Sequence, residues 1–109
     1  MKNCNMVIAN CTTAAQYFHL LRRQMRRTFR KPLFVMAPKK LLKFRGAGSP
    51  LEDFAQGLRF QRSLADNNPD LVDDKKVRKV IFCSGQVYYD LEAHRAKNNM
   101  NDVAIWRVE

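Results

Sequence analysis

Twice along its 109 residues the chain runs from a short apolar segment, through a segment of helical length, into a second short apolar segment. The first copy predicts strands at residues 6–10 and 33–38 with a helix at 14–30 between them, and the second copy runs from residue 77 to 109. Continuous apolar strands that alternate with helices are typical of parallel sheets. The sequence therefore predicts an α/β fold made of two partial strand–helix–strand units of parallel sheets, joined by a linker.

Local signals mark the expected ends of these elements. Thr12 or Thr13 offers a side-chain oxygen that can cap the first helix, and Pro32 cannot continue the helical hydrogen-bond ladder. Residues 39–76 hold the turn and linker sequences "GAGSP", "NNP" and "DLVDDKK", with one short helix expected at 51–56. This segment is predicted to connect the two units.

The predicted elements do not complete a fold. Four strands and two main helices are too few to cover both faces of parallel sheets with helices. The sequence also ends directly on the apolar strand segment "IWRVE". We therefore expect a segment of a larger α/β protein. In isolation it should expose apolar strand edges and a helix-free sheet face, and should aggregate, swap or dimerise.

The net charge of +10 is concentrated in the first part of the chain. Residues 1–65 hold 13 Lys and Arg against 2 Asp and Glu, whereas residues 66–109 hold 7 against 8. A basic surface of this kind attracts nucleic acid, anionic lipid or acidic metabolites, and charge alone does not choose among them. The position of the charges on the first helix is more informative.

The expected helix at 14–30 has an apolar side and a cationic side at helical spacing. The apolar side is formed by Ala14, Phe18, Leu21, Met25 and Phe29. The cationic side is formed by Arg22, Arg23, Arg26, Arg27 and Arg30, with His19 among them. Three interpretations fit this pattern: a solvated face, a nucleic-acid-binding surface, or one wall of a site for a small anion. Because the aromatic residues lie on the apolar side, they are expected in the core rather than as a stacking platform for bases.

His19 precedes Arg22, Arg23 and Arg26 by three, four and seven residues, so these cations lie near it on a helix. Their charge favours the neutral imidazole, which donates one hydrogen bond and accepts another. On the cationic side, the imidazole is expected to reach a cleft without loss of core packing. These four residues are therefore the candidate anion-binding residues. His94, on the second helix, is interpreted as a surface residue.

The cysteines and the apolar runs exclude other classes of protein. Cys4, Cys11 and Cys83 are odd in number and form no CxxC pair, which indicates buried free thiols in a reducing compartment rather than disulfides or a metal site. The longest apolar runs fall far short of the ~20 residues that span a bilayer, and no signal-peptide pattern opens the chain. No membrane span is expected.

Five motifs carry a resemblance to a known family: "YFHLLRRQ", "FRKPL", "PKKLL", "CSGQVYYDL" and "DVAIWRVE". In these motifs, their order and their spacing, nearly the whole chain resembles the thiamine-diphosphate-dependent decarboxylating component of 2-oxoglutarate dehydrogenases, a transketolase-like family. The resemblance implies that residues 1–38 are the end of a pyrimidine-binding domain. It implies an interdomain linker at 39–76 and the start of the transketolase C-terminal domain at 77–109.

The resemblance also implies a function for the full-length chain. That enzyme decarboxylates 2-oxoglutarate with thiamine diphosphate and magnesium, and passes the succinyl unit to a lipoyl-bearing succinyltransferase in the citric acid cycle. It is expected to be a homodimer of the mitochondrial matrix or the bacterial cytoplasm, without a nucleic-acid partner. His19 matches the histidine of the family's "FHLLRRQ" motif, and is expected to bind and orient the substrate. The main cofactor and metal motifs are expected outside this segment, which by itself should be inactive.

The sequence departs from the family pattern at a few positions. Ala14 stands where the family usually has proline and Lys40 where serine is common, and "KFRGAGSPLED" differs from the usual basic, proline-containing loop. A regulatory ligand site in that loop is therefore not carried over. The 2-oxoadipate paralogue shares "QYFHLLRRQ", whereas "VYYDL" and "KNNMNDVAI" favour the oxoglutarate enzyme. The 2-oxoadipate enzyme and a basic nucleic-acid-binding module remain the alternatives.

Overall fold

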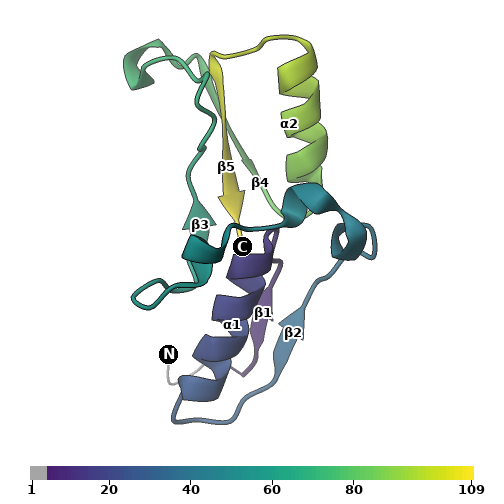
Figure 1. Cartoon of the computed structure of the whole chain (residues 1–109), viewed down its shortest axis with the longest axis vertical. Helices are drawn as coiled ribbons and strands as arrows, with labels where there is room; N and C mark the ends of the chain where they lie inside the picture. Colours follow the sequence, from purple (N-terminus) through teal and green to yellow (C-terminus); the bar gives the residue numbers. More distant parts are fainter. Residues whose placement is uncertain (1–4) are drawn as a thin grey trace. The chain divides into compact units, whose positions relative to one another are not determined.

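The computed structural model describes residues 5–109 and contains two compact units, which divide between Gln61 and Arg62. Each unit holds one of the two predicted strand–helix–strand copies together with part of the predicted linker (Figure 1). Residues 39–76 therefore do not form a separate segment in the structure. The part up to Gln61 belongs to the first unit, and the part from Arg62 belongs to the second.

The first unit is built on two short parallel strands and one helix. Strand β1 (Val7–Ala9) pairs with strand β2 (Leu33–Val35), with Val7 opposite Leu33 and Ala9 opposite Val35. Helix α1 (Ala14–Arg26) connects the two strands and lies alongside them in Figure 1. This arrangement confirms the parallel pairing that the apolar strands predicted.

Helix α1 begins where the sequence predicts but ends four residues early. Thr13 is the N-cap, and its side-chain oxygen accepts a hydrogen bond from the backbone N–H of Gln16 at 3.3 Å. The prediction that the helix continues to Arg30 is wrong, because Arg27 already takes an extended backbone conformation. The β-branched Thr28 and the aromatic Phe29 are weak helix formers. The ring of Pro32 would also clash with a helical carbonyl four residues before it.

The side of α1 that is buried is not the predicted one. Its buried residues are Ala15, Gln16, His19 and Leu20. Phe18, Leu21 and Met25, which the pattern assigns to the core, are exposed large apolar side chains in this structure. Periodicity separates two sides of a helix, but it does not say which side another segment covers.

The segment that covers α1 is the stretch 49–61, which we call the strap. It contains a short 3₁₀ helix at Leu51–Phe54, where the sequence predicts a short helix over 51–56. Phe60 of the strap joins Ala9 and Leu20 in the core of the first unit, with Cys11, Leu33 and Val35 packed around them. The strap therefore supplies part of the core that the two strands and the helix lack.

The second unit contains a mixed sheet. Strand β4 (Lys79–Cys83) and strand β5 (Val103–Val108) are parallel and are connected by helix α2 (Val87–Lys97). A third strand, β3 (Ser63–Leu64), pairs antiparallel with β5 on its other side, which gives the order β3-β5-β4 (Figure 1). The predicted parallel pairing of the two strands around α2 is confirmed, and β3 is an additional antiparallel strand that the sequence did not predict. A two-residue strand within a linker sequence has no periodicity to reveal it.

Two backbone positions explain how α2 is set between its strands. Gly85 precedes the helix with a φ of 65°, a left-handed conformation that glycine adopts without steric cost. Asn99 follows the helix with a φ of 50°, and asparagine is among the residues that tolerate this region best. The helix packs on β5, where the Arg107 guanidinium lies 4.2 Å from the centroid of the Tyr88 ring.

Apolar side chains of both sheets are exposed in this structure. In the second unit, Phe82 lies opposite Trp106 with 6.3 Å between the ring centroids, and both rings are exposed together with Val80 and Val108. In the first unit, Ile8 and Phe34 are paired across the sheet and exposed. These observations agree with the expectation of an incompletely covered sheet. Within residues 5–109, neither helix has the length and apolar character that crossing a bilayer requires.

Candidate functional site

A basic cavity of about 360 Å³ lies in the first unit. Its lining residues are His19, Arg22, Arg23, Arg26, Arg27, Arg59 and Phe60. The first five belong to α1 or its C-terminal end, and the last two belong to the strap. None of the described residues that line it carries a carboxylate. The cavity therefore gathers positive charge that no lining side chain neutralises.

His19 is the buried member of this group. Only 3% of the residue is exposed, and its Nε2 atom lies 2.7 Å from the main-chain carbonyl oxygen of Asp53. Because a carbonyl oxygen only accepts, Nε2 carries the hydrogen in this contact. The other ring nitrogen, Nδ1, has no hydrogen-bond partner among the described residues. The imidazole therefore keeps one buried ring nitrogen without a partner within residues 5–109.

Three of the arginines already make contacts within the protein. Arg22 donates to the main-chain carbonyl of Leu58, and the Arg23 guanidinium lies 4.3 Å from the centroid of the Phe60 ring. The Arg27 guanidinium lies 5.2 Å from the centroid of the Phe29 ring. Arg26 and Arg59 are exposed and have no hydrogen bond, ion pair or ring contact within residues 5–109. These two guanidiniums are available to an anion.

The strap is held on α1 by hydrogen bonds at both ends. Ser49 accepts from the backbone N–H of Ala15 at 3.1 Å, at the beginning of the helix. The buried side chain of Gln16 bonds twice to the backbone of Gln61, donating to its carbonyl at 2.6 Å and accepting from its N–H at 3.0 Å. Together with the bond from His19 to Asp53, these contacts determine where Arg59 and Phe60 reach the cavity.

This arrangement is suited to binding a small anion with more than one negative charge. An arginine fork can bind a carboxylate through two parallel hydrogen bonds. The part of the chain that the structure describes contains no group of three or more His, Cys, Asp or Glu side chains that could hold a metal ion.

The structure brings the four predicted anion-binding residues, His19, Arg22, Arg23 and Arg26, to one cavity. His19 lies with the arginines of the cationic side at this cavity, and the strap covers it, so the residue is buried. Sequence reasoning missed Arg59, Phe60 and Gln16. Arg59 and Phe60 lie within the predicted linker. In the sequence, Gln16 cannot be distinguished from any other polar residue of a helix. Nothing in their local sequence signals contacts across more than 30 residues.

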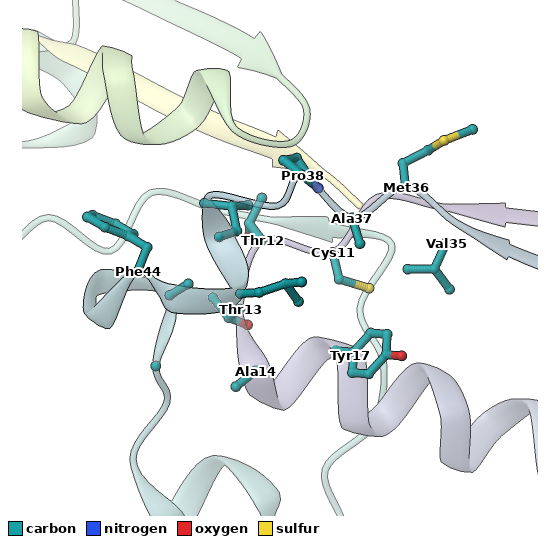
Figure 2. A pocket seen from close by; sticks show the side chains of 14 residues that line it. Cys11, Thr12, Thr13, Ala14, Tyr17, Val35, Met36, Ala37, Pro38 and Phe44 are labelled. Atoms are coloured by element: carbon teal, nitrogen blue, oxygen red, sulfur yellow. The ribbon is translucent and has the colours of Figure 1, made fainter.

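A second cavity, of about 440 Å³, lies where β1 and β2 end and α1 begins. Figure 2 shows the side chains of Cys11, Tyr17, Val35, Met36 and Phe44 around it. Its lining is mostly apolar and includes no Lys, Arg, Asp or Glu among the described residues. A charged substrate therefore has no partner there, and the basic cavity is the better candidate.

The cysteines and His94 were the other residues interpreted from the sequence. Cys11 and Cys83 are half-buried thiols, and burial raises the pKa of the Cys83 thiol. Cys4 lies outside the described residues. His94 is exposed at the end of α2 and lies beside Asn98, with 3.3 Å between their nitrogen atoms. This confirms the interpretation of His94 as a surface residue.

Comparisons with known proteins place the chain in a family. Residues 48–109 match the model of the 2-oxoglutarate dehydrogenase C-terminal family, and residues 2–45 match that of the transketolase pyrimidine-binding domain. The 2-oxoglutarate dehydrogenase E1 component of Brucella anthropi is 49% identical over 112 residues, which cover 96% of this chain. The mitochondrial 2-oxoglutarate dehydrogenase of Dictyostelium discoideum is 45% identical over 109 residues, which cover 99% of this chain.

The matched region is a small part of these relatives, since the chain spans 11% of the length of each. The two family matches meet between residues 45 and 48, whereas the compact units divide after Gln61. The strap therefore belongs to the C-terminal match by sequence, and packs on the helix of the pyrimidine-binding match by structure. Over both matches, the chain belongs to the 2-oxoglutarate dehydrogenase family.

Proposed function

We propose that the protein to which this chain belongs decarboxylates 2-oxoglutarate with thiamine diphosphate. We further propose that it transfers the succinyl unit to a lipoyl-bearing succinyltransferase. The relatives from Brucella and Dictyostelium, which match 96% to 99% of this chain, support this proposal. The same comparison supports a mitochondrial matrix or bacterial cytoplasmic location, because the relatives come from a mitochondrion and from bacteria.

The observation that carries the proposal is the basic cavity at His19. The substrate has two carboxylates, and the cavity offers five guanidiniums without a competing acidic side chain among the described lining residues. His19 lies beside these cations with Nδ1 buried and unpaired, and we propose that it orients the substrate while the arginines hold the substrate's charge. We assign His19 to substrate binding and orientation, and Arg22, Arg23 and Arg26 to the anion-binding wall.

The proposed domains are the end of a pyrimidine-binding domain at residues 1–38, an interdomain linker at 39–76, and the start of the C-terminal domain at 77–109. The two family matches support the order of the domains. The strap departs from a simple linker, because it is hydrogen-bonded to α1 along its length. We propose that the full-length protein is a homodimer.

Residues 5–109 provide no binding site for the magnesium ion that accompanies the cofactor. They hold no cluster of three or more side chains of the kind that ligate metal ions. Magnesium ligands are therefore proposed to come from other parts of the full-length chain, and we assign no step of the cofactor's chemistry to residues 5–109. Their proposed part is to bind and orient the dicarboxylate.

The test is the substitution His19→Ala in the full-length enzyme, with His94→Ala as the matched control. His19→Ala removes the hydrogen bond to the Asp53 carbonyl, so we expect a loss of about 1 kcal/mol of stability. Turnover of 2-oxoglutarate should fall by about 10- to 1000-fold, the range for losing one positioned polar group. Thiamine diphosphate affinity should change little. His94→Ala should behave like the wild type.

The pair of measurements is the thermal midpoint with cofactor and the steady-state kinetics with 2-oxoglutarate. Unchanged kinetics in His19→Ala would remove His19 from the site. If the thermal midpoint falls strongly and the activity falls only as much as the unfolded fraction rises, His19 contributes to packing and not to substrate binding. A wild-type enzyme without activity on 2-oxoglutarate would reject the proposed function itself.

A further inference from the structure

The strap leaves helix α1 and returns to it at almost the same place. At its first residue, the Ser49 side chain accepts a hydrogen bond from the backbone N–H of Ala15 at 3.1 Å. At its last residue, the backbone of Gln61 makes two hydrogen bonds with the side chain of Gln16, at 2.6 Å and 3.0 Å. Because Ala15 and Gln16 are consecutive, the two ends of the strap lie close together. A loop of this length with neighbouring ends is an Ω-loop.

The tip of the strap, residues 53–59, lies one to two turns further along α1. The main-chain carbonyl of Asp53 accepts a hydrogen bond from His19, and that of Leu58 accepts one from Arg22. The tip therefore covers the imidazole of His19, which is 3% exposed. While the tip is in place, neither ring nitrogen can meet a ligand, because Nε2 is bonded and Nδ1 is buried.

The base of the strap, residues 49, 60 and 61, is held more firmly than the tip. At the base, Phe60 is part of the core of the first unit, and its neighbour Gln61 is bonded to the buried side chain of Gln16. In the tip, six of the seven residues are exposed, and Phe54 is half-buried against the ring of Phe18. Segments with little buried apolar surface open locally more easily than segments in the core. The strap is therefore expected to open at its tip before it leaves α1 at its base.

The covered position of the tip has two unfavourable features. Nδ1 of His19 is buried without a hydrogen-bond partner within residues 5–109, and a buried acceptor without a partner loses its hydration without compensation. The tip also brings Arg59 to a cavity that four other arginines line, and like charges repel one another. Movement of the tip away from α1 returns Nδ1 to water and separates Arg59 from these charges.

Gly57 offers a way to shift the tip without removing any of its contacts. Its φ is 96°, a backbone conformation that glycine adopts freely and that alanine does not. A methyl group at this position would have no atom within 4 Å outside its own chain neighbours, so it would meet no steric obstacle. Gly57→Ala therefore disfavours the covered position of the tip through backbone conformation alone.

We propose that the strap is a lid on His19. Its ends stay bound at Ala15 and Gln16, while the tip opens and exposes the imidazole to the substrate. This inference rests on the proposed function, in which His19 orients the substrate. The described conformation is then the closed lid, and the bond from His19 to the Asp53 carbonyl is an autoinhibitory contact that breaks when the lid opens.

The experiment uses the full-length enzyme and diethyl pyrocarbonate, a reagent that modifies a histidine ring nitrogen when it can reach it. The rate of modification is measured at His19 and at His94, which is exposed on α2 and serves as a control in the same molecule. Gly57→Ala should increase the rate at His19 by about 5- to 30-fold, the population shift that corresponds to the cost of a left-handed alanine. The rate at His94 should not change.

The matched control variant is Gln56→Ala, which changes the exposed neighbour of Gly57 at a position without a positive φ. It should leave the rates at both histidines unchanged. Amide hydrogen exchange within α1 should be the same in both variants and in the wild type, because the base of the strap stays in place. If Gly57→Ala does not increase the rate at His19, or if faster exchange throughout α1 accompanies the increase, the lid is rejected.

Steady-state kinetics connect the lid to the reaction. If the substrate binds only when the lid is open, kcat/KM for 2-oxoglutarate should rise in Gly57→Ala by the same factor as the modification rate at His19, because apparent affinity follows the competent fraction. An unchanged or lower kcat/KM, with His19 more reactive, would overturn the proposed role of the lid. A wild-type enzyme without activity on 2-oxoglutarate would reject the proposed function, whereas the modification rates would still decide whether the strap opens.

Discussion

Arg95 and Asp66 form a buried ion pair in the second unit, with 6% and 3% of their side chains exposed. Both terminal nitrogens of Arg95 donate to the Asp66 carboxylate, and one of them also donates to the carbonyl of Val103 at 3.2 Å. The same carboxylate accepts from the backbone N–H of Ile105 at 2.7 Å and from that of Asn68 at 3.0 Å. The pair therefore ties the segment before β4 to both α2 and β5.

We predict that Asp66→Asn destabilises the second unit strongly. The substitution leaves the Arg95 charge buried without a counter-charge, which costs about 3–5 kcal/mol. Denaturant unfolding of the chain, followed through the fluorescence of Trp106, its single tryptophan, would measure this loss. The control is Asp102→Asn, because the partner of Asp102 is Arg78, whose side chain is 63% exposed. That variant should unfold close to the wild type. Similar losses in both variants would contradict the prediction.

A second prediction concerns the loss of folding stability at low pH. Burial by itself raises the pKa of Asp66, but the hydrogen bonds from Arg95, Ile105 and Asn68 outweigh it and hold the pKa below its usual value. A lowered pKa in the folded state means that Asp66 stabilises the fold fully above its unfolded pKa of about 3.9. This contribution is lost as the pH falls through the lower folded pKa.

The measurement is the difference in unfolding midpoint between the wild type and Asp66→Asn as a function of pH. We expect a constant difference from about pH 7 to pH 5, and a decrease only below about pH 4. A difference that already shrinks between pH 7 and pH 5 would mean that the pKa of Asp66 is raised in the folded state, and would refute the predicted direction of the shift.

The third prediction concerns the exposed apolar face of the second sheet. The isolated 109-residue chain should self-associate and bind a hydrophobic dye, because Val80, Phe82, Trp106 and Val108 are exposed together. Phe82→Lys should weaken both effects by placing a charge in this face. Leu51→Lys introduces the same charge at an exposed apolar position outside the sheet, and should change little. A monomeric wild type without dye binding, judged by sedimentation, would contradict the prediction.

Much of the first unit and of the site follows from contacts between near neighbours in the sequence. The side chain of Thr13 accepts a hydrogen bond from the backbone of Gln16, only three residues later. The start of α1 can therefore be predicted from a short stretch of sequence. His19, Arg22, Arg23 and Arg26 meet at one cavity because helical spacing alone puts them on one side. The parallel pairing of β1 with β2 and of β4 with β5 follows from apolar strands separated by helices.

Tertiary structure decided which side of α1 is covered and what completes the cavity. The bonds from Gln16 to Gln61, from His19 to Asp53 and from Arg95 to Asp66 join residues 45, 34 and 29 positions apart. The groups that accept the first two are main-chain carbonyls, which every residue carries, so the local sequence has no pattern that reports them. The motifs of the chain carried the resemblance to the family, and the helical spacing of its arginines predicted the cationic stripe along α1. Only the folded chain, by laying the strap across α1, brought Arg59 to that stripe and enclosed His19.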